Sequence, residues 1–213
     1  MKPRILAVDT THEYGSIALG SEVAPLHSPT GFAHVIYPHI RELLERCGVR
    51  LDSVDCFAAA SGPGSFTGVR VGLACIKGLA EAMGKPAVAV SNLEALATFG
   101  TAALRAVVID ARRGDVYGAV YDAAGGLVVP ETVGKLAEWL ASMPAGDLEF
   151  ISTDFTAFGD GLPAGRRITA PRELAGAVAQ IAGARLLRGE ACDPAALDAN
   201  YVRRSDAELY WKE

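Results

Sequence analysis

The chain has 213 residues, of which half are hydrophobic and 21% are charged, and its formal net charge is −5. This composition predicts a folded globular protein of one or two domains and excludes a disordered chain. The negative charge argues against salt-sensitive binding of nucleic acid by this chain alone. No segment reaches the ~20 apolar residues of a membrane span, and the amino terminus lacks a signal-peptide core, so we expect a cytoplasmic protein without a membrane partner.

The first half of the chain alternates between predicted strands and helices. Two short apolar runs around a polar turn predict a β-hairpin, and apolar residues at helical spacing predict the first helix. In chain order we expect strands at 4–8 and 15–19, a helix at about 33–47, a strand at 55–60, a helix at 66–83, a strand at 86–90 and a short helix at 92–99.

The same pattern begins again near residue 104. Asp9 and Asp110 each end a predicted strand before a polar turn and a returning strand. The repeat predicts an α/β fold of two duplicated lobes, residues 1–103 and 104–213, each a mixed sheet with flanking helices. The elements expected in the second lobe are strands at 106–110, 116–121 and 127–129, a helix at 132–140, a strand at 148–151 and a helix at 172–187.

Two lobes that each open with strand, Asp, turn and strand resemble the actin-like (ASKHA) ATPase architecture, in which paired hairpins hold the phosphates of a nucleotide. Asp9, Thr10 and Asp110 are the corresponding candidates here. The first turn has no glycine where phosphates approach the backbone, and Glu13 adds negative charge. We therefore interpret these residues as vestigial, with Asp side chains that hold their turns through backbone amides. An actin-like ATPase or phosphotransferase that uses Asp9 and Asp110 remains the alternative.

The run SGPGSFTGVRVGLACIKGLA, residues 61–80, has the appearance of a phosphate-binding loop before a helix. Its spacing fits neither the P-loop nor the dinucleotide fingerprint. We expect Ser65 to cap the helix. Three glycines in the helix interior, Gly68, Gly72 and Gly78, each cost about 1 kcal/mol relative to alanine and suggest the close approach of another helix. That helix could belong to the same lobe or to a partner protein.

The same run is very similar to the signature of the TsaB (YeaZ) family. The start ILAVDTT with GSIAL, the central VVIDARRGDVYGAVY and the terminal ANYVRR match the family in the same order, over nearly the whole chain. The resemblance implies an actin-like fold and a non-catalytic scaffold that is required for threonylcarbamoylation of the adenosine next to the anticodon in tRNA.

The resemblance also implies partners. It implies a complex with a TsaD-like transferase and a TsaE-like ATPase, a homodimer when the chain is alone, and contact with tRNA only through the complex. It implies no catalytic residue and no cofactor bound by this chain alone, with ATP expected only in the complex. The two helices at 34–47 and 65–83 would form the interface, with the candidates His34, Ile36, Ile40, Gly68, Val69, Gly72, Leu73 and Ile76.

A metal site and a peptidase site are both disfavoured by the spacing of the residues. His34 and His39 are five positions apart, which places the two rings well apart around a helix. We therefore expect no metal. A peptidase is the remote alternative, because the chain has no H-E-x-x-H motif and shows no Ser/His/Asp arrangement.

Overall fold

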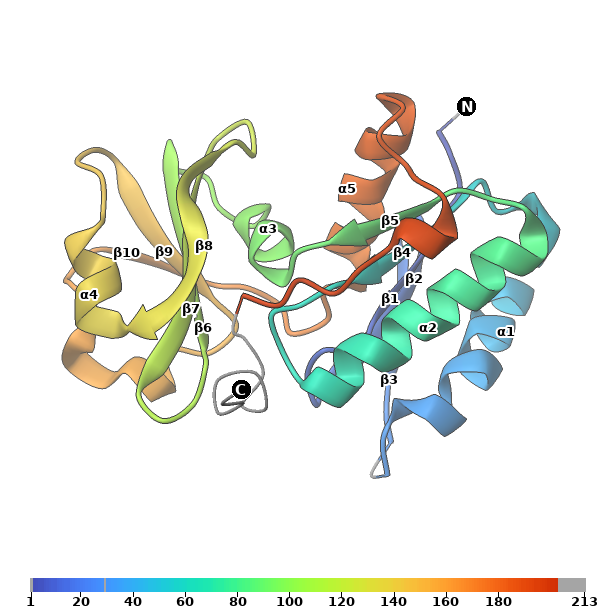
Figure 1. Ribbon diagram of the computed structural model, residues 1–213, viewed down its shortest axis with the longest axis horizontal. Helices are drawn as coiled ribbons and strands as arrows, with labels where there is room; N and C mark the ends of the chain where they lie inside the picture. Colours follow the sequence, from blue (N-terminus) through green and yellow to red (C-terminus); the bar gives the residue numbers. More distant parts are fainter. Residues whose placement is uncertain (1, 29, 203–213) are drawn as a thin grey trace, which may run out of the picture. The chain divides into compact units, whose positions relative to one another are not determined.

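A computed structural model describes residues 2–28 and 30–202, which form two compact units (Figure 1). The first contains residues 2–95 and 172–199, and the second contains residues 96–171 and 200–202. This division differs from the boundary expected between residues 103 and 104. Helix α5 (Ala175–Leu187) packs against strands of the first sheet, although it follows the second sheet in the sequence. Arg203 and Arg204 of the terminal motif lie outside the described residues.

The first unit contains a five-stranded mixed sheet with the order β3-β2-β1-β4-β5. The strands β1, β2 and β3 are antiparallel neighbours, whereas β4 and β5 continue the sheet parallel to β1. The carboxyl ends of β1, β4 and β5 therefore meet at one edge. The bounds are β1 (Ile5–Asp9), β2 (Gly15–Leu19), β3 (Glu22–Leu26), β4 (Cys56–Ala60) and β5 (Ala87–Val90).

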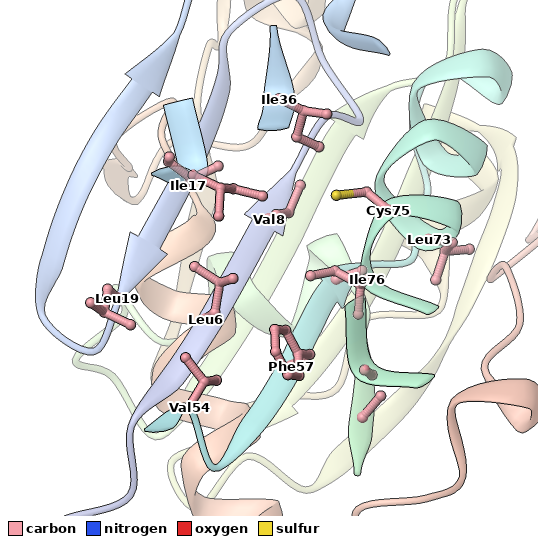
Figure 2. Packing of buried hydrophobic residues seen from close by; sticks show 14 of the residues in the cluster. Leu6, Val8, Ile17, Leu19, Ile36, Val54, Phe57, Leu73, Cys75 and Ile76 are labelled. Carbon is pink, nitrogen blue, oxygen red and sulfur yellow. The ribbon is translucent and has the colours of Figure 1, made fainter. Parts of the chain in front are cut away.

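Helices cover both faces of this sheet, and side chains alternate between the faces along each strand. Leu6 and Val8 join the core that also contains residues of α1 (Ile36–Arg46) and α2 (Phe66–Met83), and Figure 2 shows both in this packed cluster. A Cβ on Gly183 of α5 would contact Ile5, which points the other way. The short α3 (Asn92–Ala97) follows β5, and 3₁₀ turns occur at Phe32–His34, Leu51–Ser53 and Pro194–Ala196.

Helix α2 is capped at both ends. The Ser65 hydroxyl accepts the amide hydrogen of Gly68 at 3.2 Å and so caps the amino terminus. Gly84, at φ 60°, ends the helix in the left-handed conformation that glycine adopts without steric cost. Pro38 lies in the first turn of α1, where its missing N–H is tolerated.

The second unit repeats the sheet topology of the first, because its order β8-β7-β6-β9-β10 has the same sequence of antiparallel and parallel pairings. Trp139 on α4 (Leu136–Ala141) packs over Gly118 and edge-on to Phe150, which places the core under this helix. The bounds are β6 (Leu104–Asp110), β7 (Asp115–Asp122), β8 (Leu127–Lys135), β9 (Leu148–Ser152) and β10 (Arg166–Thr169), with a 3₁₀ segment at Thr156–Gly161.

The duplicated α/β fold is confirmed, and most elements lie where the sequence predicts them. The expected helix at 132–140 is wrong in its first half, because β8 runs to Lys135 in register with β7 and α4 begins only at Leu136. The exposed edge strands β3 and β10 were not predicted. None of the helices in residues 2–28 and 30–202 has the length and apolar character needed to cross a membrane.

Candidate functional site: the first hairpin turn and the paired helices

Asp9 ends β1 and is completely buried. Its Oδ1 atom accepts the Thr11 amide hydrogen at 2.9 Å and the Thr11 hydroxyl at 2.6 Å. Its Oδ2 atom has no hydrogen-bond partner among the described residues. A buried polar atom without a partner costs free energy, so the Oδ2 atom is energetically unfavourable in this position. The Oδ1 atom of Asp9 therefore holds the first hairpin turn through Thr11.

Asn92 links the segments that follow the three parallel strands. Its side-chain amide donates to the Thr11 hydroxyl at 2.7 Å and lies 3.1 Å from His12 Nε2. Its Oδ1 atom accepts the amide hydrogen of Gly62 at 2.9 Å. The Thr11 hydroxyl donates its one hydrogen to Asp9 and therefore accepts from Asn92. The hydrogen bonds thus run from Asn92 through Thr11 to Asp9. The carboxyl edge of the sheet, where open α/β sheets commonly bind ligands, is here cross-linked internally.

The glycine-rich loop before α2 closes on the same turn. The amide of Ser65 donates to the carbonyl of Thr11 at 2.7 Å. A Cβ on Gly64 would lie 2.5 Å from that carbonyl oxygen, and one on Gly68 would lie 2.0 Å from the carbonyl oxygen of Thr10. These glycines therefore allow the first turn of the same chain to approach. The expectation that another helix approaches at Gly68 and Gly72 is wrong, since Gly72 also faces Thr10.

Asp110 is the counterpart of Asp9 in the second unit. Its Oδ1 atom accepts the amide hydrogen of Arg112 at 2.8 Å, and its Oδ2 atom lies 3.5 Å from the Arg112 guanidinium. Its side chain is 31% exposed, unlike the buried Asp9. Each of the two candidate acids thus bonds to its own hairpin turn, but with different burial and different partners.

The predicted interface residues lie mostly inside the first unit. His34 is exposed, whereas the others are buried in the core between the helices and the sheet. Figure 2 shows Ile36, Leu73 and Ile76 in the packed cluster with Phe57 and Val8. Their apolar character therefore serves the fold of this chain. The buried members are Ile36, Ile40, Gly68, Val69, Gly72, Leu73 and Ile76.

The exposed face of α2 is a different stripe, which sequence reasoning missed. Phe66, Arg70, Ala74, Gly78 and Ala82 recur every fourth residue, and all five are exposed. We call these five residues the α2 stripe. The Arg70 guanidinium lies 3.6 Å from the centre of the Phe66 ring, and Phe66 is 48% exposed. The spacing of four residues can be read from the sequence, but the larger apolar residues of α2 were the stronger signal for an interface.

Helix α1 is joined to α2 beside this stripe. Tyr37 is 51% exposed, and its hydroxyl is hydrogen-bonded to the buried Cys75 of α2. Burial raises the pKa of the Cys75 thiol to about 11, and the hydrogen bond from Tyr37 works in the opposite direction. The Coulombic effect of Cys75 and burial raise the pKa of Tyr37. Both groups are therefore protonated at neutral pH, and the contact is a neutral one.

The two histidines near the start of α1 lie in different surroundings. His34 is exposed, while His39 is half-buried with its Nδ1 atom 2.8 Å from the carbonyl oxygen of Val35. In the described ranges, no group of three or more His, Cys, Asp or Glu side chains could hold a metal ion.

The fold and these sites define an α/β protein of the actin-like duplicated class. The sequence model of one family, TsaD: tRNA N6-adenosine threonylcarbamoyltransferase, matches residues 18–191. The TsaB protein of Bacillus subtilis strain 168, described as a tRNA threonylcarbamoyladenosine biosynthesis protein, is 37% identical over 153 residues, or 67% of each chain. The chain therefore belongs with the TsaD-related proteins and, within them, to the TsaB (YeaZ) family.

Two further relatives agree with this membership. The TsaB protein of Escherichia coli K12 is 37% identical over 126 residues, which span 55% of this chain and 54% of that protein. The match thus spans about half the length of the Escherichia coli relative. The structure of YeaZ from Pseudomonas aeruginosa superposes with a TM-score of 0.80 at 30% identity, and the match covers 93% of this chain and 99% of that one.

Proposed function

We propose that this chain is a non-catalytic scaffold subunit in the threonylcarbamoylation of the adenosine next to the anticodon in tRNA. In this role it binds a TsaD-like transferase, and a TsaE-like ATPase joins the complex. The proposal is supported by membership of the TsaB family, whose curated members are named as threonylcarbamoyladenosine biosynthesis proteins. It is also supported by the match of residues 18–191 to the transferase family itself, since related subunits commonly pair through equivalent surfaces.

The α2 stripe is the observation that carries the proposal. Glycine in a helix interior costs about 1 kcal/mol relative to alanine. Gly68 and Gly72 have a reason within this chain, but a Cβ on Gly78 would meet nothing within 4 Å. A partner helix that approaches closely at Ala74 and Gly78 would explain why a glycine is kept at position 78 despite this cost. Phe66 and Tyr37 would then provide exposed aromatic anchors, the residue class enriched at binding hot spots.

The same surface accounts for the expected homodimer. In the absence of the transferase, two copies can bury the α2 stripe against each other around a twofold axis. A homodimer and a heterodimer would then compete for one face. The net charge of −5 supports the further proposal that the partner holds most of the tRNA.

We also propose that the isolated chain binds no nucleotide, so that ATP enters only with the complex. The Oδ1 atom of Asp9 is engaged by Thr11, and Gly64 and Gly68 are covered by the first turn. The unpaired Oδ2 atom of Asp9 is the observation that favours the ATPase alternative. Calorimetry of the chain with Mg-ATP separates the two. Binding heat that disappears in Asp9→Asn would support the ATPase.

The interface is tested with an arginine placed at Ala74. Ala74→Arg inserts a long cation into the stripe, where alanine allows close approach, and it should weaken the transferase complex by at least tenfold. Ala184 is an exposed alanine on α5, so Ala184→Arg is the matched control for charge and size. Binding is measured by calorimetry, and folding by circular dichroism. Equal binding by both variants would refute the assignment of the interface to the stripe.

A further inference from the structure

The turn between β6 and β7 contains two arginines in an unfavourable backbone conformation. Arg112 has φ 66° and Arg113 has φ 56°, and they are the only residues other than glycine with positive φ in the described parts of the chain. The left-handed region is disfavoured for any side chain with a Cβ. Glycine or asparagine would form this turn more easily. Such strain is commonly retained where side chains have a task outside the fold.

The side chains of the two arginines are not needed to form the turn. Its backbone closes through the amide of Ala111 to the carbonyl of Asp115 and the amide of Asp115 to the carbonyl of Arg112, both at 3.0 Å. The Asp110 carboxyl group then accepts the Arg112 amide hydrogen. Lys135 at the end of β8 fastens the turn from the neighbouring strand, because it donates to the Arg113 carbonyl at 3.3 Å. The turn is therefore held rigidly with both guanidinium groups outside these bonds.

The charges at this turn leave one cation in excess. Arg112 lies 3.5 Å from Asp110, and Lys135 lies 2.5 Å from Asp115. The Arg113 side chain has no ion pair or hydrogen bond with another described residue, and Arg113 is exposed. The guanidinium of Arg112 is also accessible, since its side chain is 87% exposed. Two exposed guanidinium groups on one turn that carries a net positive charge suit a phosphate oxygen.

We propose that the Arg112–Arg113 turn contacts a backbone phosphate of the tRNA while the chain is part of the transferase complex. This inference rests on the proposed function, because tRNA is the phosphate polymer that the pathway presents. The overall charge of −5 limits this chain to a small share of the RNA contacts. One well-placed phosphate contact should orient the tRNA rather than supply most of its affinity.

The test compares tRNA binding by complexes that carry Arg113→Gly or the wild-type chain. Glycine accepts φ 56°, so the variant should keep its turn and melt at the same or a higher temperature. The affinity for an unmodified tRNA transcript, measured by fluorescence anisotropy, should fall about three- to tenfold at low salt, and the slope of log K against log salt should decrease by about 1. Arg113→Lys should retain part of the affinity. Arg188→Ala, which removes an exposed arginine of the first unit, should change neither quantity.

The outcomes distinguish this inference from the proposed function. Wild-type affinity and salt slope in Arg113→Gly, with the complex intact by light scattering, would overturn the phosphate contact and leave the scaffold role untouched. If Arg113→Gly lost Mg-ATP binding by the complex but kept its tRNA affinity, the phosphate contact with tRNA would also be overturned, because the turn would then bind a nucleotide. If no complex with the transferase forms, the scaffold role fails, and the same variants are compared on the chain alone at low salt. Equal tRNA binding there would also overturn the contact.

Discussion

The different roles of the glycines in α2 predict opposite effects for the same substitution at Gly68 and Gly78. At Gly68, an alanine Cβ would lie 2.0 Å from the carbonyl oxygen of Thr10, so the helix and the first turn must separate by more than 1 Å. Thr10 is buried, and its hydroxyl donates to the carbonyl of Gly68 at 2.7 Å. Overpacking typically costs about 1–3 kcal/mol and a lost hydrogen bond about 1 kcal/mol, against a gain in helix propensity of about 1 kcal/mol.

We therefore expect Gly68→Ala to lower the free energy of unfolding by about 2 kcal/mol. Gly78→Ala should raise it by about 1 kcal/mol, because its Cβ meets open space and only the propensity gain remains. Melting temperatures followed by circular dichroism should then differ by roughly 6–12 °C, at about 2–4 °C per kcal/mol for a chain of this size. Equal melting temperatures for the two variants would refute the assignment of Gly68 to the approach of the first turn.

Three further substitutions or titrations test other parts of the structure. Asp9→Asn should fold with wild-type stability, whereas Asp9→Ala should lose about 1–3 kcal/mol in urea unfolding, because Thr11 then lacks its acceptor. Glu149 is buried and accepts hydrogen bonds from the backbone amides of residues 101 and 102, so Glu149→Ala should lower the free energy of unfolding by about 3 kcal/mol. The same substitution at the exposed Asp147 should lower it by less than about 0.5 kcal/mol. Burial raises the pKa of the Cys56 thiol from 9.0 to about 12, so its reaction with a disulfide reagent at pH 8 should require unfolding. The unfolded chain releases this proton first, so stability should decline as the pH rises from about 9 toward 12; fast labelling of the folded chain, or a flat pH profile, would contradict this.

The elements with strong local signals were predictable from the sequence. Strand β2 and helix α2 have the predicted bounds, because five apolar or small residues between turns mark the strand and Ser65 and Gly84 mark the ends of the helix. The edge strand β3 was missed because its residues are largely exposed and include Pro25. A partly exposed strand lacks the apolar periodicity on which sequence-based prediction depends.

The candidate interface shows the limit of hydrophobicity as a guide. Val69, Leu73 and Ile76 suggested a partner surface because α2 is apolar around most of its circumference. The structure buries all three in the core of the same unit. The exposed face of α2, which we propose as the partner surface, instead consists of smaller or charged residues such as Ala74 and Arg70, whose exposure depends on tertiary packing. The packing of α5 on the sheet of the first unit was also not predictable, because local sequence does not determine which of two similar sheets a helix will cover.

Light scattering of the mixed proteins tests most directly whether the α2 stripe binds a TsaD-like transferase. The wild-type chain alone should elute as a homodimer at micromolar concentration and convert to a one-to-one heterodimer when the transferase of the same organism is added. Ala74→Arg should remain monomeric in both samples, while Ala184→Arg should behave like the wild type. A wild-type chain whose mass is unchanged by the transferase would contradict the scaffold role, and a heterodimer that Ala74→Arg forms as readily as the wild type would move the interface elsewhere.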